Sequence, residues 1–230
     1  MLALAWCLGG WPMSARAGEK SAEPRERIGD EAAARRVALI QERLDRGTAS
    51  ARWWWYGWLA GYSVATLAQG AVGVATHDRA LRATMLVGAG GSALGALSVV
   101  AFPFPPTYAA NELRASEGLP LPERHVLALE SLRACADAET QGRSWLPHAL
   151  GLAVASAQGL VLWIGFDQPL DGVESAALSL LVSEAQIFSQ PMRAVDDFAS
   201  YQRQFLRPRP TAVQWRLTPS PGGLALRAQW

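Results

Sequence analysis

Lysine, cysteine and charge are all scarce in this chain of 230 residues. Lys20 is the only lysine, and Cys7 and Cys135 are the only cysteines. Loss of a cleaved leader would remove Cys7, so no internal disulfide is expected. Charged residues make up 18% of the sequence and the formal net charge is +1, whereas an average soluble domain is roughly 25% charged. A near-neutral chain of this kind argues against a nucleic-acid surface.

Motifs that carry chemistry are also missing. The three histidines, His77, His125 and His148, show no spacing typical of metal ligands. The chain has no G-x-S-x-G motif, no phosphate-binding glycine loop and no paired cysteine and histidine nucleophile. We therefore expect no catalytic residue, no metal and no cofactor, and the sequence indicates no reaction.

Two N-terminal segments precede the predicted fold. Residues 1–17 combine a short apolar run with Ala15-Arg16-Ala17, which is typical of a secretory signal peptide. No basic residue precedes the apolar run, so a plain apolar N-terminus is the alternative. Residues 18–29 are polar and contain Pro24, which predicts a tether.

Apolar residues at helical spacing begin after residue 30. Val37, Ile40 and Leu44 lie among alternating charges in residues 30–50, which predicts an amphipathic helix. We favour packing of its apolar face on the rest of the protein over a position along a lipid surface.

Three long uncharged segments follow, residues 53–75, 83–103 and 144–166. An apolar helix of about 20 residues crosses a hydrocarbon layer roughly 30 Å thick, so each segment is long enough to span a bilayer. A fourth segment, residues 173–190, also has this length but contains Glu184 near its middle. The prediction for residues 30–204 is therefore an all-α membrane bundle of three to four hydrophobic helices.

Tryptophans lie near the ends of these segments, where aromatic rings suit the headgroup level of a bilayer. The spacing of Trp145 and Trp163 places them about 27 Å apart along a helix, close to the hydrocarbon thickness. The predicted interface anchors are Trp53, Trp54, Trp55, Trp58, Trp145 and Trp163. The alternative is that these rings fill a soluble helical core.

Small residues four positions apart recur in all three uncharged segments, which favours close packing of helices in a bundle. The predicted packing pairs are Gly57 and Gly61, Gly91 and Gly95, and Ala155 and Gly159.

Glu184 is the most informative polar residue, because a carboxyl inside a bilayer is costly unless it is neutral, paired or facing a cavity. Gln69 and Gln158 lie near the midpoints of their own segments. We expect their amides to hydrogen-bond to Glu184 across the bundle, forming a polar intramembrane cluster. Our preferred interpretation is that the cluster fixes helix register, and a proton-linked or polar-solute site is the alternative.

Two further elements are predicted outside the hydrophobic segments. Residues 121–142 place Val126, Leu129 and Leu132 at helical spacing, which predicts an extramembrane helix. In the tail, residues 205–230, apolar and polar residues alternate on both sides of a Pro/Gly-rich turn. This pattern predicts a short C-terminal β-hairpin.

The placement of arginine conflicts with a cleaved leader. Arginines are frequent before residue 53, between residues 103 and 144, and after residue 190, whereas only Arg79 and Arg82 lie on the other side. The positive-inside rule then puts both termini and the long connection in the cytoplasm. Cleavage of a leader would instead export the N-terminus, so the orientation stays open.

Four runs, RWWWYGWLAGY, GRSWLPH, WIGFDQP and SEAQIFSQP, together resemble a group of uncharacterised bacterial envelope proteins that carry a leader followed by apolar helices. The resemblance covers roughly residues 30–204. It implies an envelope location. It assigns no activity, because the group has no assigned function.

The leading hypothesis is a small helical protein of a bacterial envelope membrane, the inner membrane first, with a structural or complex-subunit role and no enzymatic activity. Its expected partners are the lipid bilayer and a second copy or another envelope protein. One alternative is a small proton-linked transporter-like protein that uses Glu184. The other is a lipid-acting membrane enzyme, for which His148 is the first residue to test.

Overall fold

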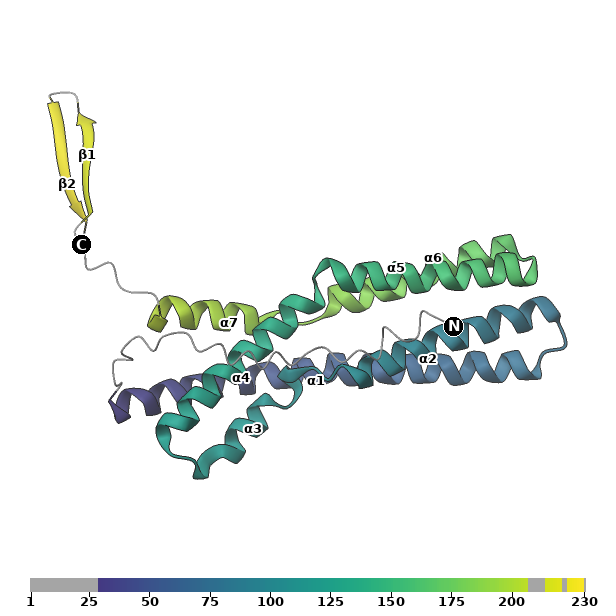
Figure 1. The fold of residues 1–230 in the computed structure, drawn as a ribbon, viewed down its shortest axis with the longest axis horizontal. Helices are drawn as coiled ribbons and strands as arrows, with labels where there is room; N and C mark the ends of the chain where they lie inside the picture. The colour runs from purple at the N-terminus through teal and green to yellow at the C-terminus, as the bar shows by residue number, and fades with distance from the viewer. Residues whose placement is uncertain (1–28, 207–213, 221–222, 230) are drawn as a thin grey trace, which may run out of the picture.

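The computed structural model describes residues 29–206, 214–220 and 223–229, with side chains described up to residue 206. The predicted leader and, apart from Gly29, the predicted tether lie outside the described residues. Nearly all of the chain between residues 30 and 206 is helical (Figure 1), which confirms the all-α fold class.

Seven α-helices follow one another in the described part of the chain. They are α1 (Asp30–Ala75), α2 (Arg79–Ala101), α3 (Ala109–Ala115), α4 (Leu121–Gly142), α5 (Trp145–Leu160), α6 (Pro169–Ser189) and α7 (Arg193–Tyr201). Short 3-10 turns at Pro105–Thr107 and Ser116–Gly118 flank α3, and π-helical turns at Val161–Gly165 and Gln202–Leu206 extend α5 and α7.

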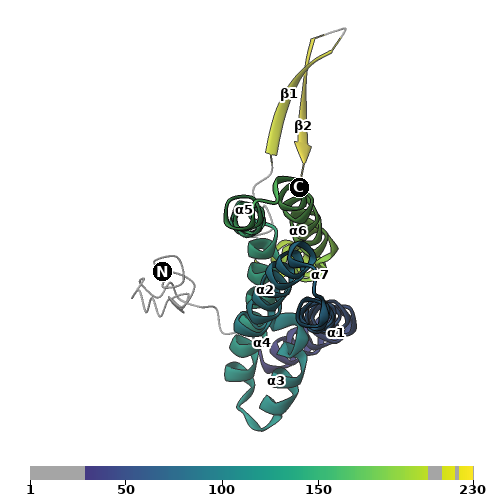
Figure 2. The same ribbon diagram turned by 90° about the vertical axis from the view of Figure 1, so that its right-hand side faces the viewer.

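Two short strands lie in the C-terminal tail. β1 (Gln214–Ser220) pairs antiparallel with β2 (Gly223–Gln229), with Gln214 opposite Gln229 and Ser220 opposite Gly223. In Figures 1 and 2 the two strands lie away from the helices.

The first helix is longer than expected. The predicted amphipathic helix and the first apolar segment form one unbroken helix of 46 residues, α1. No proline lies between Asp30 and Ala75 to interrupt it. At the rise of an α-helix this gives a rod about 69 Å long. Both halves of the molecule are built on this rod.

The N-terminal half of α1 packs with α3, α4 and α7 into a head that has its own core. Ile40, Leu113, Leu132 and Tyr201 are each at most 1% exposed. Val37 and Leu44 belong to the same cluster, so the expectation that the amphipathic helix packs on the protein is confirmed.

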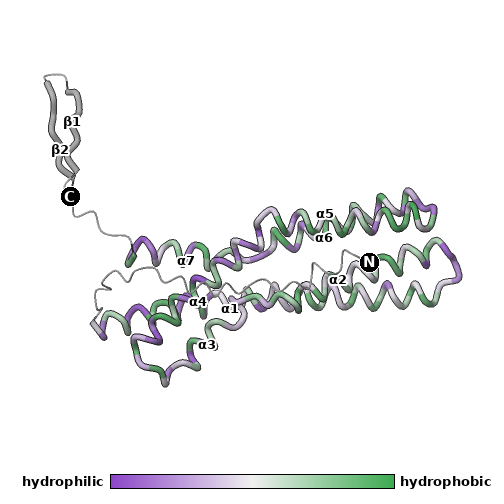
Figure 3. The backbone as a smooth tube through the Cα atoms, in the orientation of Figure 1, coloured by the Kyte–Doolittle hydropathy of each residue, from purple (hydrophilic) through white to green (hydrophobic). Residues whose placement is uncertain are grey.

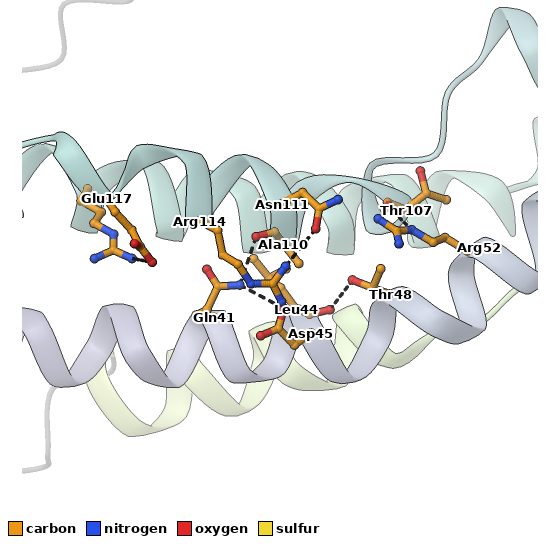
Figure 4. A network of polar contacts seen from close by, with 11 residues as sticks. Gln41, Leu44, Asp45, Thr48, Arg52, Thr107, Ala110, Asn111, Arg114 and Glu117 are labelled. Carbon is orange, nitrogen blue, oxygen red and sulfur yellow. Dashed lines mark hydrogen bonds and ion pairs between the residues drawn. The ribbon is translucent and has the colours of Figure 1, made fainter.

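Polar contacts fasten α1 to the chain around α3 (Figure 4). Gln41 Nε2 donates to Asp45 Oδ1 at 3.0 Å and to the Ala110 carbonyl at 3.1 Å. Arg114 forms an ion pair with Asp45 and donates to Asn111 Oδ1 at 2.9 Å. These contacts cover one side of the head core.

Two helical hairpins extend from the head (Figures 1 and 2). The second half of α1 pairs with α2, and α5 pairs with α6; each pair is joined by a short turn at the end far from the head. Figure 3 shows hydrophobic residues along both hairpins and hydrophilic residues concentrated in the head. Many large apolar side chains of the hairpins are at least 60% exposed, including Val64, Leu67, Leu97, Ile164 and Leu181.

Two helices in the described part are long and apolar enough to cross a membrane, Arg79–Ala101 and Trp145–Gly165. Three to four such helices are predicted from the sequence, so the structure supports fewer. The second half of α1 is less hydropathic because it is rich in tryptophan, tyrosine and glycine, and α6 carries Asp171, Glu174 and Glu184.

Candidate functional site

The carboxyl of Glu184 is paired with an imidazole. Glu184 Oε2 on α6 lies 2.8 Å from His148 Nδ1 on α5, and the two side chains are 29% and 33% exposed. The Phe188 ring lies beside the imidazole, with 5.7 Å between ring centroids. His148 entered the sequence analysis only as a separate candidate, so the structure assigns Glu184 a partner that the sequence analysis did not.

The two glutamines of the predicted cluster, Gln69 on α1 and Gln158 on α5, lie against α2 instead. Ser92 Oγ donates to Gln69 Oε1 at 3.1 Å. A Cβ added at Gly88 would lie 3.1 Å from the Gln69 amide nitrogen, and one at Gly91 would lie 1.7 Å from that of Gln158. The two glycines therefore make room for one glutamine from each hairpin.

The Glu184 carboxyl and the two glutamine amides lie at different levels along the hairpins. Glu184 lies about 22 Å along α6 from Pro169, whereas Gln69 lies about 9 Å along α1 from Ala75. No hydrogen bond within the described residues joins Glu184 to Gln69 or Gln158. The structure thus places the carboxyl near the head and the glutamines nearer the far turns.

The tryptophan run of α1 lies where the hairpins leave the head. Trp54 Nε1 donates to the Gln186 carbonyl at 3.2 Å, and Trp58 Nε1 donates to Ser189 Oγ at 3.1 Å. One turn further along α1, the Tyr62 hydroxyl donates to Gln186 Oε1 at 2.8 Å. These bonds tie the first hairpin to the C-terminal end of α6.

The other predicted anchors differ in exposure. Trp53 is 83% exposed, Trp145 is 76% exposed and Trp163 is 53% exposed. Trp55 is half-buried. Exposed rings therefore lie at both ends of α5 and its π-helical turn, and their role as interface anchors stays a prediction.

The predicted small-residue pairs are used unequally. A Cβ added at Gly57 or Gly61 would meet no atom within 4 Å, so the Cβ positions of both glycines face open space among the described residues. A Cβ at Gly95 would lie 2.6 Å from the Tyr62 ring, and one at Gly159 would lie 2.8 Å from the Gly172 carbonyl oxygen. Ala155 is buried.

Two arginines donate hydrogen bonds to backbone carbonyls at the boundary between head and hairpins. Arg143 Nη2 donates to the carbonyls of Phe188 and Gln190 at 2.8 and 2.7 Å, which satisfies acceptors at the end of α6. Arg52 Nε donates to the Thr107 carbonyl at 2.9 Å. Both guanidinium groups therefore lie at the level where the apolar hairpins begin.

A buried carboxyl in the head was missed by the sequence analysis. Glu139 is 2% exposed, and its Oε2 accepts from the Val195 backbone N–H at 3.0 Å, at the start of α7. Burial raises the pKa of Glu139 to about 7, against the lowering effect of this hydrogen bond and with a raising contribution from Asp197. The signal was present in the sequence, because Leu132, Cys135 and Glu139 fall on one helix face.

The thiol of Cys135, one turn earlier on α4, is also buried. Cys135 is fully buried, and burial together with the nearby Glu139 raises the pKa of its thiol to about 12. No group of three His, Cys, Asp or Glu side chains within the described residues has an arrangement that would hold a metal ion.

No family model, no curated protein and no solved structure matches this chain. The likeness to bacterial envelope proteins stays a prediction.

Proposed function

We propose that this chain is a membrane-integrated structural protein or complex subunit, with both hairpins in a bilayer and the head outside it. The observation that carries the proposal is the contrast between the two halves. The head buries its apolar side chains, whereas the hairpins leave theirs exposed along their length. Such a surface promotes association in water and is solvated by lipid tails.

The pairing of helices within each hairpin implies that four helices cross the bilayer, because each of the two candidate spans has a partner helix beside it. Gly73, Gly88 and Gly95 of the first hairpin approach Leu86, Gln69 and Tyr62 in antiparallel order, so α2 runs back along the second half of α1. The connecting turn has only three residues. If α2 crosses the bilayer, its partner must cross too, and the same reasoning joins α6 to α5.

Arginine supports an orientation with the head in the cytoplasm. Arg52 and Arg143 lie at the head end of the hairpins, and most other arginines of the described residues belong to the head. The far turns are preceded or followed only by Arg79 and Arg82. By the positive-inside rule we place the head on the cytoplasmic face of a bacterial inner membrane.

Polar groups within the hairpins favour a structural role. Gln69 bonds to Ser92, Tyr62 bonds to Gln186, and Thr84 Oγ1 donates to Gln168 Oε1 at 3.2 Å. The first two bonds each join two helices, and the third joins α2 to the turn before α6, so all three fix helix register. A second copy of the chain or another envelope protein is the partner that we propose for the assembled bundle.

Carbonate extraction of membranes tests integration. We expect the chain to stay in the membrane pellet at high pH, because apolar helices resist extraction that releases peripheral proteins. Leu97→Arg and Leu181→Arg should impair integration, since each puts a charge on an exposed hairpin face. Leu119→Arg is the matched control, an exposed leucine of the head. Release of the unmodified chain by carbonate would contradict the proposal.

Cysteine labelling tests the orientation. In a background with Cys7→Ser and Cys135→Ala, we introduce His77→Cys at a far turn or Ser50→Cys in the exposed head surface. A membrane-impermeant maleimide should label the cysteine at position 77 in intact spheroplasts and the one at position 50 only after lysis. The reverse pattern would place the head outside.

The pair of His148 and Glu184 favours a second candidate, proton-linked transport. Two titratable side chains share a hydrogen bond inside a proposed hairpin. Glu184→Gln in reconstituted vesicles separates the candidates: retained folding with lost proton flux supports transport, and lower hairpin stability with no flux in either protein supports the structural role.

A further inference from the structure

A groove of about 380 Å³ lies at the boundary between the head and the first hairpin. Ligand pockets of proteins commonly measure roughly 300–1,000 Å³, so the groove can receive a small molecule or a headgroup. It lies between the middle of α1 and the chain that follows α2. The residues that line it are Arg52, Trp55, Tyr56, Pro103, Thr107 and Tyr108.

The walls of the groove offer hydrogen-bond donors that the described residues leave unused. Arg52 uses Nε on the Thr107 carbonyl (Figure 4), and no ion pair within the described residues involves its guanidinium. The Trp55 indole Nε1 is buried and has no hydrogen-bond partner among the described residues. A buried donor without an acceptor is unfavourable, so a rotation of the Trp55 ring that turns Nε1 toward a ligand in the groove would stabilise the site.

The groove lies at the level of lipid headgroups if the hairpins are in a bilayer. Arg52 directly precedes the uncharged part of α1, and Pro103 follows the end of α2. Tyr56 and Tyr108 are 59% and 37% exposed at this level. Arginine, tryptophan and tyrosine are the side chains enriched where a bilayer meets water.

We propose that this groove binds the phosphate of a phospholipid headgroup, with Arg52 as its ionic partner and Trp55 Nε1 as a second donor. The inference rests on the proposed membrane location. Arginine binds phosphate through parallel, charge-assisted hydrogen bonds. None of the described residues that line the groove is acidic. An anionic headgroup is therefore favoured over one that carries an ammonium group.

Native mass spectrometry of the purified full chain in nonionic detergent tests the site. The probes are dihexanoylphosphatidylglycerol, dihexanoylphosphatidylcholine and inorganic phosphate. We expect one phosphatidylglycerol to be retained per chain, with an affinity at least about ten-fold above that of either other probe. Inorganic phosphate that binds as tightly as the lipid would overturn the headgroup assignment and leave a free-anion site.

Three variants locate the binding. Arg52→Gln removes the charge and Trp55→Phe removes the indole N–H while keeping an aromatic ring, so each should weaken phosphatidylglycerol binding, Arg52→Gln by about ten-fold. Arg79→Gln, at the far turn, is the matched control and should bind as the unmodified chain does. Unchanged affinity in Arg52→Gln, or an equal loss in Arg79→Gln, would overturn the proposal.

Two outcomes need separate readouts. Arg52→Gln also loses the bond to the Thr107 carbonyl, so if that variant fails to fold, Trp55→Phe decides and retained affinity there refutes the site. Carbonate extraction is independent of lipid binding in detergent. A chain that resists carbonate but retains no lipid refutes the groove alone, and a chain released by carbonate refutes the membrane location.

Discussion

Replacing Glu139 by glutamine should make the head more stable at neutral and alkaline pH. The carboxyl is buried beside the start of α7, where burial raises its pKa to about 7 from the ordinary 4.5. A folded-state pKa above the unfolded value means that the folded protein holds the proton more tightly. Below pH 4.5 the carboxyl is protonated in both the folded and the unfolded state, so its ionisation does not lower the free energy of unfolding there.

The penalty grows as pH rises from 4.5 to 7. Over this range the unfolded chain ionises first, so the free energy of unfolding falls, and above pH 7 the loss is complete. A shift of this size corresponds to about 3 kcal/mol. Glutamine has no proton to lose, and its side-chain oxygen can still accept from the Val195 N–H. The variant should match the natural chain near pH 4.5 and exceed it by about 3 kcal/mol at pH 8.

The charged neighbours of Glu139 do not cancel this effect. Arg43 and Arg193 line the same small cavity of about 20 Å³ together with Asp197. Arg43 Nη1 donates to the Asp197 carbonyl at 2.6 Å, and Arg193 is paired with the Asp197 carboxylate at 3.7 Å. The Asp197 charge raises the pKa of Glu139 further.

Urea unfolding in a nonionic detergent, followed by far-ultraviolet circular dichroism at pH 4.5, 6 and 8, measures the difference. Glu130→Gln is the control, because Glu130 is an exposed residue of the same helix. A stability difference that does not widen between pH 4.5 and 8 would refute the assignment of a raised pKa to a buried carboxyl. So would a Glu139→Gln variant less stable than the natural chain at pH 8.

Two further outcomes follow from packing and burial. Gly159→Leu should destabilise the second hairpin by about 1–3 kcal/mol, because a side chain there meets the Gly172 backbone, whereas Gly61→Leu should have little effect on monomer unfolding; equal losses in urea unfolding would contradict this. Cys135 should react with a thiol reagent only as fast as the head unfolds, since the thiol is fully buried with a pKa of about 12; rapid labelling of the folded chain would show that the site is open.

Local sequence signals account for the start of α2, the end of α2 and the start of α6, although the predicted segments were not drawn from the first and last of them. Asp78 accepts from the backbone N–H groups of Ala80 and Leu81 and so caps α2, as an aspartate before an apolar run should. Pro169 begins α6 at a position that needs no backbone N–H donor. Pro103 follows the end of α2. Capping and proline chemistry act within a few residues, so the sequence alone is enough to predict them.

Pairing between helices was beyond such signals. Glu184 met His148 because α5 and α6 align so that residues 36 apart in sequence become neighbours. The run of residues 173–190, treated as the whole helix, predicts Glu184 near its middle. The helix α6 begins before this run, so Glu184 lies further from its middle than the run suggested. The hydrophobic pattern of the sequence indicates which segments form apolar helices. Only the packed structure shows which of these helices face one another.

The course of α1 joins these findings into one argument about location. Its buried side chains, among them Val37, Ile40 and Leu44, end at Ala51, and no residue is buried again until Gly73. A single helix therefore passes from a closed core into an apolar stretch that α2 and the other described helices cover only in part. Arg52 and the tryptophan run lie at this change. In the proposed membrane arrangement, lipid tails cover the surface of this stretch that α2 leaves exposed.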